Sequence, residues 1–191
     1  MPVAGAVAHS PTPSHKEVIP VIDYMSIEEQ VEVDFVRACK KAWVRRLLFR
    51  LTKGPGSGRM SCFAEVRGRM GAAGGVRVGR RDVRSEDIVG SVGRCSEFDA
   101  AFLPVSKGAR KRWERIDRAF RRGDELPPVS LYEIDGSYFV LDGNHRVSVA
   151  RYHGVEWLDA EVTAFHSRLP ETGNASATAL PRSTALAVSV T

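Results

Sequence analysis

One stretch of the sequence constrains the fold more than any other: residues 138–154 read YFVLDGNHRVSVARYHG. The apolar run at its start predicts a strand, and Gly143 allows the backbone to turn sharply after it. The one-turn spacing of Val147 and Ala150 predicts a helix that ends before Gly154. We therefore expect a strand, a tight turn and a helix in direct succession.

A second strand is predicted directly before this unit. Residues 131–134 and 138–141 are both β-rich, and Asp135-Gly136-Ser137 separates them. Asp-Gly between two such runs is a strong hairpin signal. Upstream, an amphipathic helix is predicted over residues 110–121, because apolar side chains recur there at helical spacing: Trp113, Ile116 and Phe120.

The turn at residues 142–146 predicts an anion site. Free backbone N–H groups, the positive end of the helix dipole, the His145 imidazole and the Arg146 guanidinium would meet at one point, which attracts phosphate. In a plainer interpretation, Asp142 or Asn144 only caps the helix and the two cations are its solvated first turn. Cations at a helix N-terminus oppose the dipole. An anion bound between His145, Arg146 and the helix start therefore explains the two cations better than capping does.

These residues resemble the N-terminal domain of ParB-type proteins, a superfamily that includes sulfiredoxin and a free-serine kinase. Its members hold the phosphates of a nucleotide with a strand, a Gly-x-x-Arg turn and a helix, and the turn here is Gly143-Asn144-His145-Arg146. The resemblance covers about residues 77 to 163 and makes residues 83–89 the first strand. It implies an α+β fold: a small ParB/sulfiredoxin-like domain with an N-terminal helical extension.

The resemblance also implies a cofactor, a nucleoside triphosphate such as ATP or CTP, with or without Mg²⁺. The phosphates would be held by one group of residues: Gly143, Asn144, His145 and Arg146. A second group stands where ParB has a Gln-Pro-Arg box and would close the site: Gly90, Ser91, Gly93 and Arg94. Asn144 replaces both the ParB glutamate and the sulfiredoxin cysteine, so neither base catalysis nor thiol chemistry is expected from it.

Three functions stay open at this point. The first is a nucleotide-binding ParB-like regulatory module, associated with nucleic acid although no helix-turn-helix follows the core. The second is an enzyme, a phosphotransferase or nuclease, in which Asp142 is the best candidate for a general base or a metal-holding carboxylate. The third is a partner-binding accessory protein. A homodimer is a further expectation, and no protein metal site is predicted.

A long basic helix is predicted over residues 26–52, capped by Ser26. Its buried stripe would comprise Val31, Phe35, Ala38, Ala42 and either Leu47 or Leu48. The basic segment 37–59 has three interpretations: the solvated face of a docking helix, a nucleic-acid backbone contact, or an anionic membrane contact through Trp43 and its apolar neighbours. A glycine-rich linker follows at 53–58, and then a short helix over 61–69.

Four segments result: a disordered N-terminus (1–24), the basic helical extension with its linker (25–75), the ParB/sulfiredoxin-like domain (76–165) and a disordered tail (166–191). Cys39, Cys62 and Cys95 are odd in number and widely spaced, which predicts reduced thiols in a cytoplasmic protein. No apolar stretch approaches the roughly 20 residues that span a bilayer. His153 is expected at the surface, and Asp117 is expected to be solvated or to cap a helix.

Overall fold

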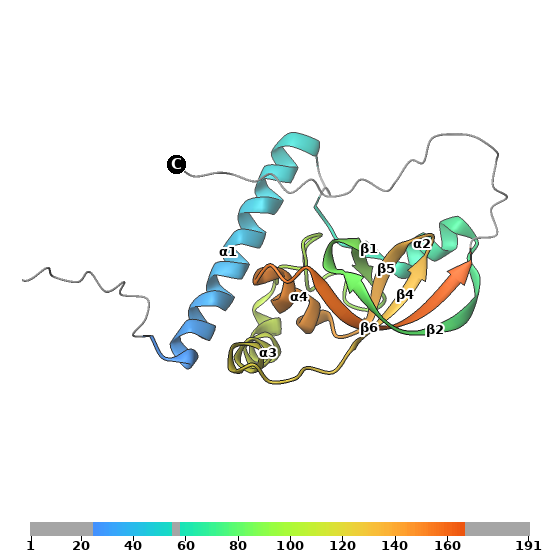
Figure 1. Ribbon diagram of the computed structural model, residues 1–191. Helices are drawn as coiled ribbons and strands as arrows, with labels where there is room; N and C mark the ends of the chain where they lie inside the picture. Colours follow the sequence, from blue (N-terminus) through green and yellow to red (C-terminus); the bar gives the residue numbers. More distant parts are fainter. Residues whose placement is uncertain (1–24, 55–57, 167–191) are drawn as a thin grey trace, which may run out of the picture.

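The computed structural model describes residues 25–54 and 58–166 and has an α+β fold (Figure 1). The predicted disorder of both ends and the centre of the predicted linker lie outside the described residues. In chain order the elements are α1 (Ile27–Lys53), β1 (Ser61–Cys62), α2 (Phe63–Met70), β2 (Ala73–Arg84), β3 (Ile88–Ser91), α3 (Arg110–Arg122), β4 (Val129–Ile134), β5 (Ser137–Asp142), α4 (Asn144–Tyr152) and β6 (Trp157–His166).

The strands form one mixed sheet in the order β1-β3-β5-β4-β6-β2. The predicted hairpin is confirmed: β4 and β5 pair antiparallel, and Asp135 and Gly136 both have positive φ (47° and 75°), as a two-residue hairpin turn requires. The β1–β3, β3–β5 and β4–β6 pairs are parallel. The chain leaves β5 through a single glycine into α4, which places the start of this helix at one edge of the sheet.

Two apolar clusters cover the two faces of the sheet. The larger one joins strand residues such as Leu131 and Val140 to α1, α3 and α4, and Trp113 is its centre. Trp113 is fully buried, contacts Phe35 edge-on at 5.7 Å between ring centroids, and donates a hydrogen bond from Nε1 to the Ser148 Oγ (2.9 Å). The smaller cluster packs α2 against the other face, around Phe139.

The predicted α1 is confirmed in its cap and in most of its buried stripe. Ser26 and Glu29 form a reciprocal capping box, and Val31, Phe35, Ala38 and Ala42 are all buried. Leu47 and Leu48 are 41% and 55% exposed, so the extension of the stripe to either of them is wrong. The C-terminal half of α1 rises past α3 and α4, where no helix or strand of the described residues covers its outer side (Figure 1).

The helical extension is not a separate unit. Phe35, Ala38 and Ala42 of α1 belong to the same core cluster as the strands, and β1 pairs with β3. The boundary predicted at residue 75 falls inside β2, which runs from Ala73 to Arg84. The periodicity of α1 predicts the helix itself, but the element against which it packs lies far along the chain.

The cysteine prediction is wrong, because Cys62 and Cys95 form a disulfide and only Cys39 is free. The two cysteines are 33 positions apart, but the parallel β1–β3 pairing aligns Cys62 with Ser91 and brings the Cα atoms within 5.6 Å. Disulfides persist mainly in oxidising compartments. The cysteines therefore no longer support a reducing, cytoplasmic location.

Asp117 and His153 are also not surface residues. Asp117 is fully buried, and its Oδ1 lies 2.5 Å from the His153 Nε2. The Arg121 guanidinium bonds both Asp117 and Asp34, and the Tyr152 hydroxyl donates to Asp34 (2.7 Å). Asp117 and His153 are buried because α1, α3 and the end of α4 pack together here. These three segments lie far apart in the sequence.

Candidate anion-binding site

The first turn of α4 offers free backbone N–H groups. Gly143 is the N-cap residue, no side chain caps the helix, and the Val147 N–H makes the first backbone bond, to the Gly143 carbonyl (3.0 Å). The N–H groups of residues 144–146 therefore precede the intrahelical ladder at the positive end of the dipole. The prediction that Asp142 or Asn144 caps the helix is wrong, which strengthens the case for an external anion.

Only glycine fits at position 143. Its φ is 100°, and a Cβ atom there would lie 2.8 Å from the Val129 Cγ1 and 3.1 Å from the Arg146 guanidinium carbon. The tight turn after β5 thus brings the backbone against β4 and aims the start of α4 away from the sheet. The short spacing between strand and helix in the sequence is what creates this exposed helix start.

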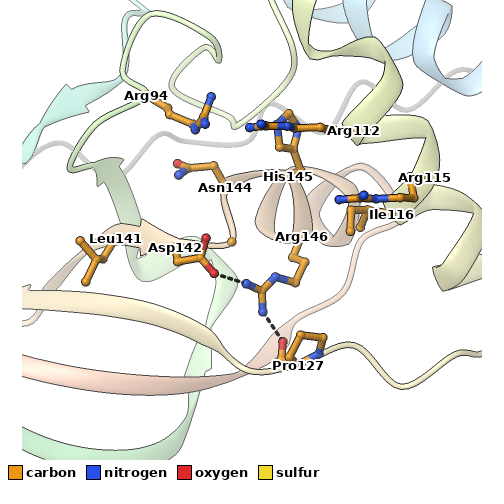
Figure 2. Close-up of a pocket in the computed structure, with 11 residues that line it drawn as sticks. Arg94, Arg112, Arg115, Ile116, Pro127, Leu141, Asp142, Asn144, His145 and Arg146 are labelled. Atoms are coloured by element: carbon orange, nitrogen blue, oxygen red, sulfur yellow. Dashed lines mark hydrogen bonds and ion pairs between the residues drawn. The ribbon is translucent and has the colours of Figure 1, made fainter.

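A cavity of about 590 Å³ lies at this helix start (Figure 2). Its walls come from five parts of the chain: the first turn of α4, the end of β5, the Arg94 loop after β3, Pro127 before β4, and the α3 residues Arg112, Arg115 and Ile116. Its volume is in the usual range of small-molecule sites. A second hollow of about 420 Å³ shares Arg94, Arg112 and His145 with it.

Arg112 and Arg115 are the cations that the sequence analysis missed. Both are exposed on α3, one helical turn apart, and neither makes a hydrogen bond or ion pair within residues 25–54 and 58–166. Figure 2 shows their side chains reaching from α3 towards the first turn of α4. The available signal was the i, i+3 spacing of Arg112 and Arg115, which places both on one face of the predicted helix, beside the face that buries Trp113.

Arg146 lies where it was predicted, but its guanidinium is already bonded. Nη1 donates to the carbonyl oxygens of Pro127 (2.5 Å) and Pro128 (2.7 Å), and Nη2 donates to the Asp142 Oδ2 (2.5 Å). Its side chain is only 12% exposed, and Figure 2 shows it directed towards Asp142 and Pro127. Arg146 therefore fixes the turn and the segment before β4, while it still forms part of the cavity wall.

Asn144 and His145 bring unpartnered polar atoms to the site. Asn144 is 5% exposed and its Oδ1 has no hydrogen-bond partner, and neither ring nitrogen of His145 has one. Burial lowers the pKa of His145 to about 4; Glu97 opposes this shift, and Arg94, Arg112 and Arg115 add to it. The imidazole is therefore neutral near neutral pH. A bound ligand could supply the hydrogen-bond partner that its ring nitrogens lack.

The residues predicted to close the site divide into two groups. Arg94 lines both hollows, and its guanidinium bonds Glu97 (2.5 Å). Ser91 is fully buried and supports this loop: its hydroxyl accepts from the Arg94 N–H (3.1 Å) and donates to the Val140 carbonyl (3.3 Å). Gly90 lies inside β3, where a Cβ would be 2.2 Å from the Ser61 carbonyl oxygen. Neither Gly90 nor Gly93 lines the cavity.

Asp142 is the carboxylate of the cavity wall. Its side chain is 76% exposed, and its ion pair is with Arg146. A second acidic cluster, Asp34 and Asp117 with His153, has ligand atoms within 4.8 Å of one another, but the cationic Arg121 already bonds both carboxylates. Among the described residues, Asp142 lines the cavity and the Asp34, Asp117 and His153 cluster does not.

Comparison of the chain with protein-family models, with curated proteins and with solved structures gives no match. In the described part of the chain, every helix is too short or too polar to cross a membrane.

Proposed function

We propose that this chain is a nucleotide-binding module that holds the phosphates of a nucleoside triphosphate at the start of α4. One observation carries the proposal: an uncapped helix N-terminus faces a cavity into which Arg94, Arg112 and Arg115 extend. Arg94 is paired with Glu97, but Arg112 and Arg115 have no ion-pair partner among the described residues, so an anion that joins them and the free N–H groups would be favoured. A chain of phosphates supplies several negative charges in one ligand.

The sequence resemblance supports the same ligand class. The Gly143-Asn144-His145-Arg146 turn is similar to the phosphate-holding turn of the ParB/sulfiredoxin superfamily, and it stands between a strand and a helix as in those proteins. On this basis we infer a ParB-like regulatory role, with ATP or CTP as the nucleotide. Mg²⁺, where used, would join the phosphate oxygens to Asp142, because Mg²⁺ prefers oxygen ligands.

Calorimetric titration with ATP, CTP and GTP, each with and without Mg²⁺, tests the proposal. We expect saturable binding of at least one nucleotide, weakened by added salt because much of the attraction is between charges. The double variant Arg112→Ala/Arg115→Ala should lose this binding, whereas Lys111→Ala, an exposed cation on the same helix outside the cavity, should keep it. A folded protein that binds none of the nucleotides would refute the proposal.

The second candidate function is a phosphotransferase or nuclease, and the position of Asp142 in the cavity wall favours it. Its carboxylate would have to leave Arg146 to accept a proton or hold a metal. Because Asn144 stands at the ParB glutamate position and cannot act as a base, we expect slow or absent hydrolysis. Rapid phosphate release that Asp142→Asn abolishes would make the enzyme the better interpretation.

A further inference from the structure

Helix α1 is apolar on two opposite faces. One face packs into the core through Phe35, Ala38 and Ala42. At helical spacing on the other side there is a second apolar row, which we call the outer stripe: Val36, Trp43, Val44, Leu47 and Leu51, exposed by 57%, 65%, 39%, 41% and 74%. An amphipathic helix needs one apolar face to dock, and within residues 25–54 and 58–166 the outer stripe belongs to neither core cluster.

Cations surround the outer stripe. Lys40 lies within it, and exposed basic residues flank it on both sides: Arg37, Lys41, Arg46 and Arg50. Of these five, only Arg37 makes an ion pair within the described part of the chain, to Asp34 (3.7 Å). No acidic residue occurs between Phe35 and Ala64, so the partner of this face must bring the negative charge.

The combination of charge and apolar surface separates the possible partners. If a second copy of α1 packed on the outer stripe, basic residues of one helix would face basic residues of the other. This holds for parallel pairing and for antiparallel pairing centred on the middle of the stripe, and like charges repel. Nucleic acid would use the cations, because phosphate contacts are electrostatic, but would leave the aliphatic side chains without a gain. An anionic lipid surface uses both: headgroups attract the cations while the apolar side chains enter the acyl boundary.

We propose that the outer stripe of α1 binds the surface of an anionic membrane, with the helix lying flat in the interface. The stripe runs from Val36 to Leu51, about 23 Å along the helix axis. Trp43 lies near its middle, and an amphipathic ring of this kind is favoured at the headgroup level. The core face of α1 stays docked on the domain, so the helix lies on the bilayer and does not cross it.

Flotation of the full chain with lipid vesicles tests this proposal. We expect the protein to float with phosphatidylcholine vesicles that contain about 30% phosphatidylglycerol and to stay behind with phosphatidylcholine alone, because the surface charge supplies much of the attraction. About 0.5 M salt should release it by screening. Equal flotation with both lipids, or none with the anionic vesicles at low salt, would overturn the proposal.

Matched variants separate the two parts of the surface. Leu47→Gln/Leu51→Gln should weaken vesicle binding more than about tenfold, because two side chains no longer leave water. Lys40→Gln/Lys41→Gln should weaken it about fivefold for each charge removed. Val76→Gln/Val78→Gln, which changes exposed apolar residues of β2, is the control and should have no effect. All six positions are exposed, so thermal unfolding should show that each variant still folds.

The same leucine variant distinguishes the other partners. If the protein binds duplex DNA with an affinity that depends on Lys40 and Lys41 but not on Leu47 and Leu51, and does not bind vesicles, the surface recognises nucleic acid and the proposal fails. If the leucine variant instead dissociates a dimer in sedimentation experiments, and vesicles do not bind, the stripe is a self-association surface. Vesicle binding that needs both leucines and lysines supports the proposal.

Discussion

Arg146 and Arg112 carry the same charge at the same cavity but have different structural roles. Arg146 ties the turn to two proline carbonyl oxygens and to Asp142, so it is already satisfied without a ligand. Arg112 and Arg115 have no hydrogen-bond or ion-pair partner within the described residues. The free cations of the site therefore come from α3, and the turn of α4 contributes its backbone N–H groups.

This division predicts opposite responses to alanine substitution. Arg112→Ala or Arg115→Ala should weaken nucleotide binding by about 1.5 kcal/mol, the scale of one charge-assisted hydrogen bond, and change the free energy of unfolding by less than about 0.5 kcal/mol. Arg146→Ala should lower the free energy of unfolding by about 1–3 kcal/mol, because it leaves two carbonyl groups without a donor. Urea unfolding and calorimetry on the same samples check both effects; a destabilised Arg112→Ala would contradict the assignment.

The protonation of His145 predicts a pH dependence. Its pKa in the folded protein is about 4, below the usual 6.5, because burial disfavours the charged ring. Between these values the unfolded chain binds a proton that the folded chain does not. The stabilisation by the neutral ring is therefore complete above pH 6.5 and is lost as the pH falls towards 4.

Urea unfolding between these pH values, with His145→Gln as the control that lacks the titrating ring, measures this dependence. A bound phosphate should raise the pKa of His145, since a nearby anion favours the charged form. Nuclear magnetic resonance titration of the ring with and without nucleotide would detect that change. A ring that titrates near 6.5 in the free protein would show that the site is more open than the structure indicates.

At the residue scale, the sequence predicts the strand–turn–helix unit that carries the candidate anion site but not the arrangement of charges around it. The Gly143-Asn144-His145-Arg146 order identifies an exposed helix start, because strand, turn and helix signals are local. Whether Arg146 is free depends on Pro127 and Pro128, which reach it only after β4 has paired with β5. The approach of Arg112 depends on how α3 packs against α4, which no local pattern encodes.

At the scale of elements, a buried polar network joins α1 to α3 and α4. Asp34, 7% exposed in its side chain, accepts hydrogen bonds from Arg121 and from the Tyr152 hydroxyl. Burial, together with the hydrogen bond to Asp34, raises the pKa of Tyr152, so its phenol stays protonated as a donor. The network supplements the apolar contact of Phe35 with Trp113 and fixes the position of α1 on the domain.

Removing one carboxylate should loosen this junction. Asp34→Ala leaves the Tyr152 hydroxyl without its acceptor and removes one acceptor of Arg121, which keeps Asp117 and Gln30. We expect this change to lower the free energy of unfolding by about 2–3 kcal/mol. Glu32→Ala on the same helix is the control, because its carboxylate is 70% exposed and 3.8 Å from Arg110, and it should change stability by less than about 0.5 kcal/mol. Equal effects in chemical unfolding would mean that the buried network contributes nothing beyond a surface pair.

Elements set by interactions between residues close in sequence are predicted, and elements set by long-range pairing are not. The helices α1, α3 and α4 and the β4–β5 hairpin are predicted from periodicity and turn residues, which act over a few positions. The first strand predicted over residues 83–89 is wrong, because β2 ends at Arg84, a 3-10 turn occupies Ser85–Asp87 and β3 begins at Ile88. The rest of β2 and the strand β6 are not predicted individually, because β2 contains four exposed or half-exposed arginines and several glycines and its partner begins more than seventy positions later. Their pairing is stabilised by ion pairs such as Arg80 with Asp159, which become visible only in the folded sheet.

At the scale of the whole molecule, the disulfide connects the two faces of the fold. Cys62 is the residue before α2, and Cys95 follows Arg94 in the loop that lines the cavity. The closed loop therefore contains β2 and β3, and its cross-link restricts the unfolded chain. A disulfide that closes a loop of this length stabilises by about 3–4 kcal/mol in the chain-entropy model.

Reduction should therefore lower the stability of the protein by up to this amount. Urea unfolding with and without reductant measures the change, and Cys62→Ser/Cys95→Ser should match the reduced protein and lose its response to reductant. Cys39→Ser is the control that keeps the bond. Alkylation of the unreduced, unfolded protein should label one thiol; labelling of three would contradict the disulfide.

The place of β6 in the sheet has a consequence for protein synthesis. Among residues 25–54 and 58–166, β6 is the last strand in chain order, yet it lies between β4 and β2, and β2 pairs with no other strand of this part. While a ribosome still holds residues 157–166, β4 has an open edge and β2 has no partner, so neither can complete its hydrogen bonding. The emerging chain must wait for β6 before this sheet can close, and unpaired strand edges exposed in that interval favour misassembly.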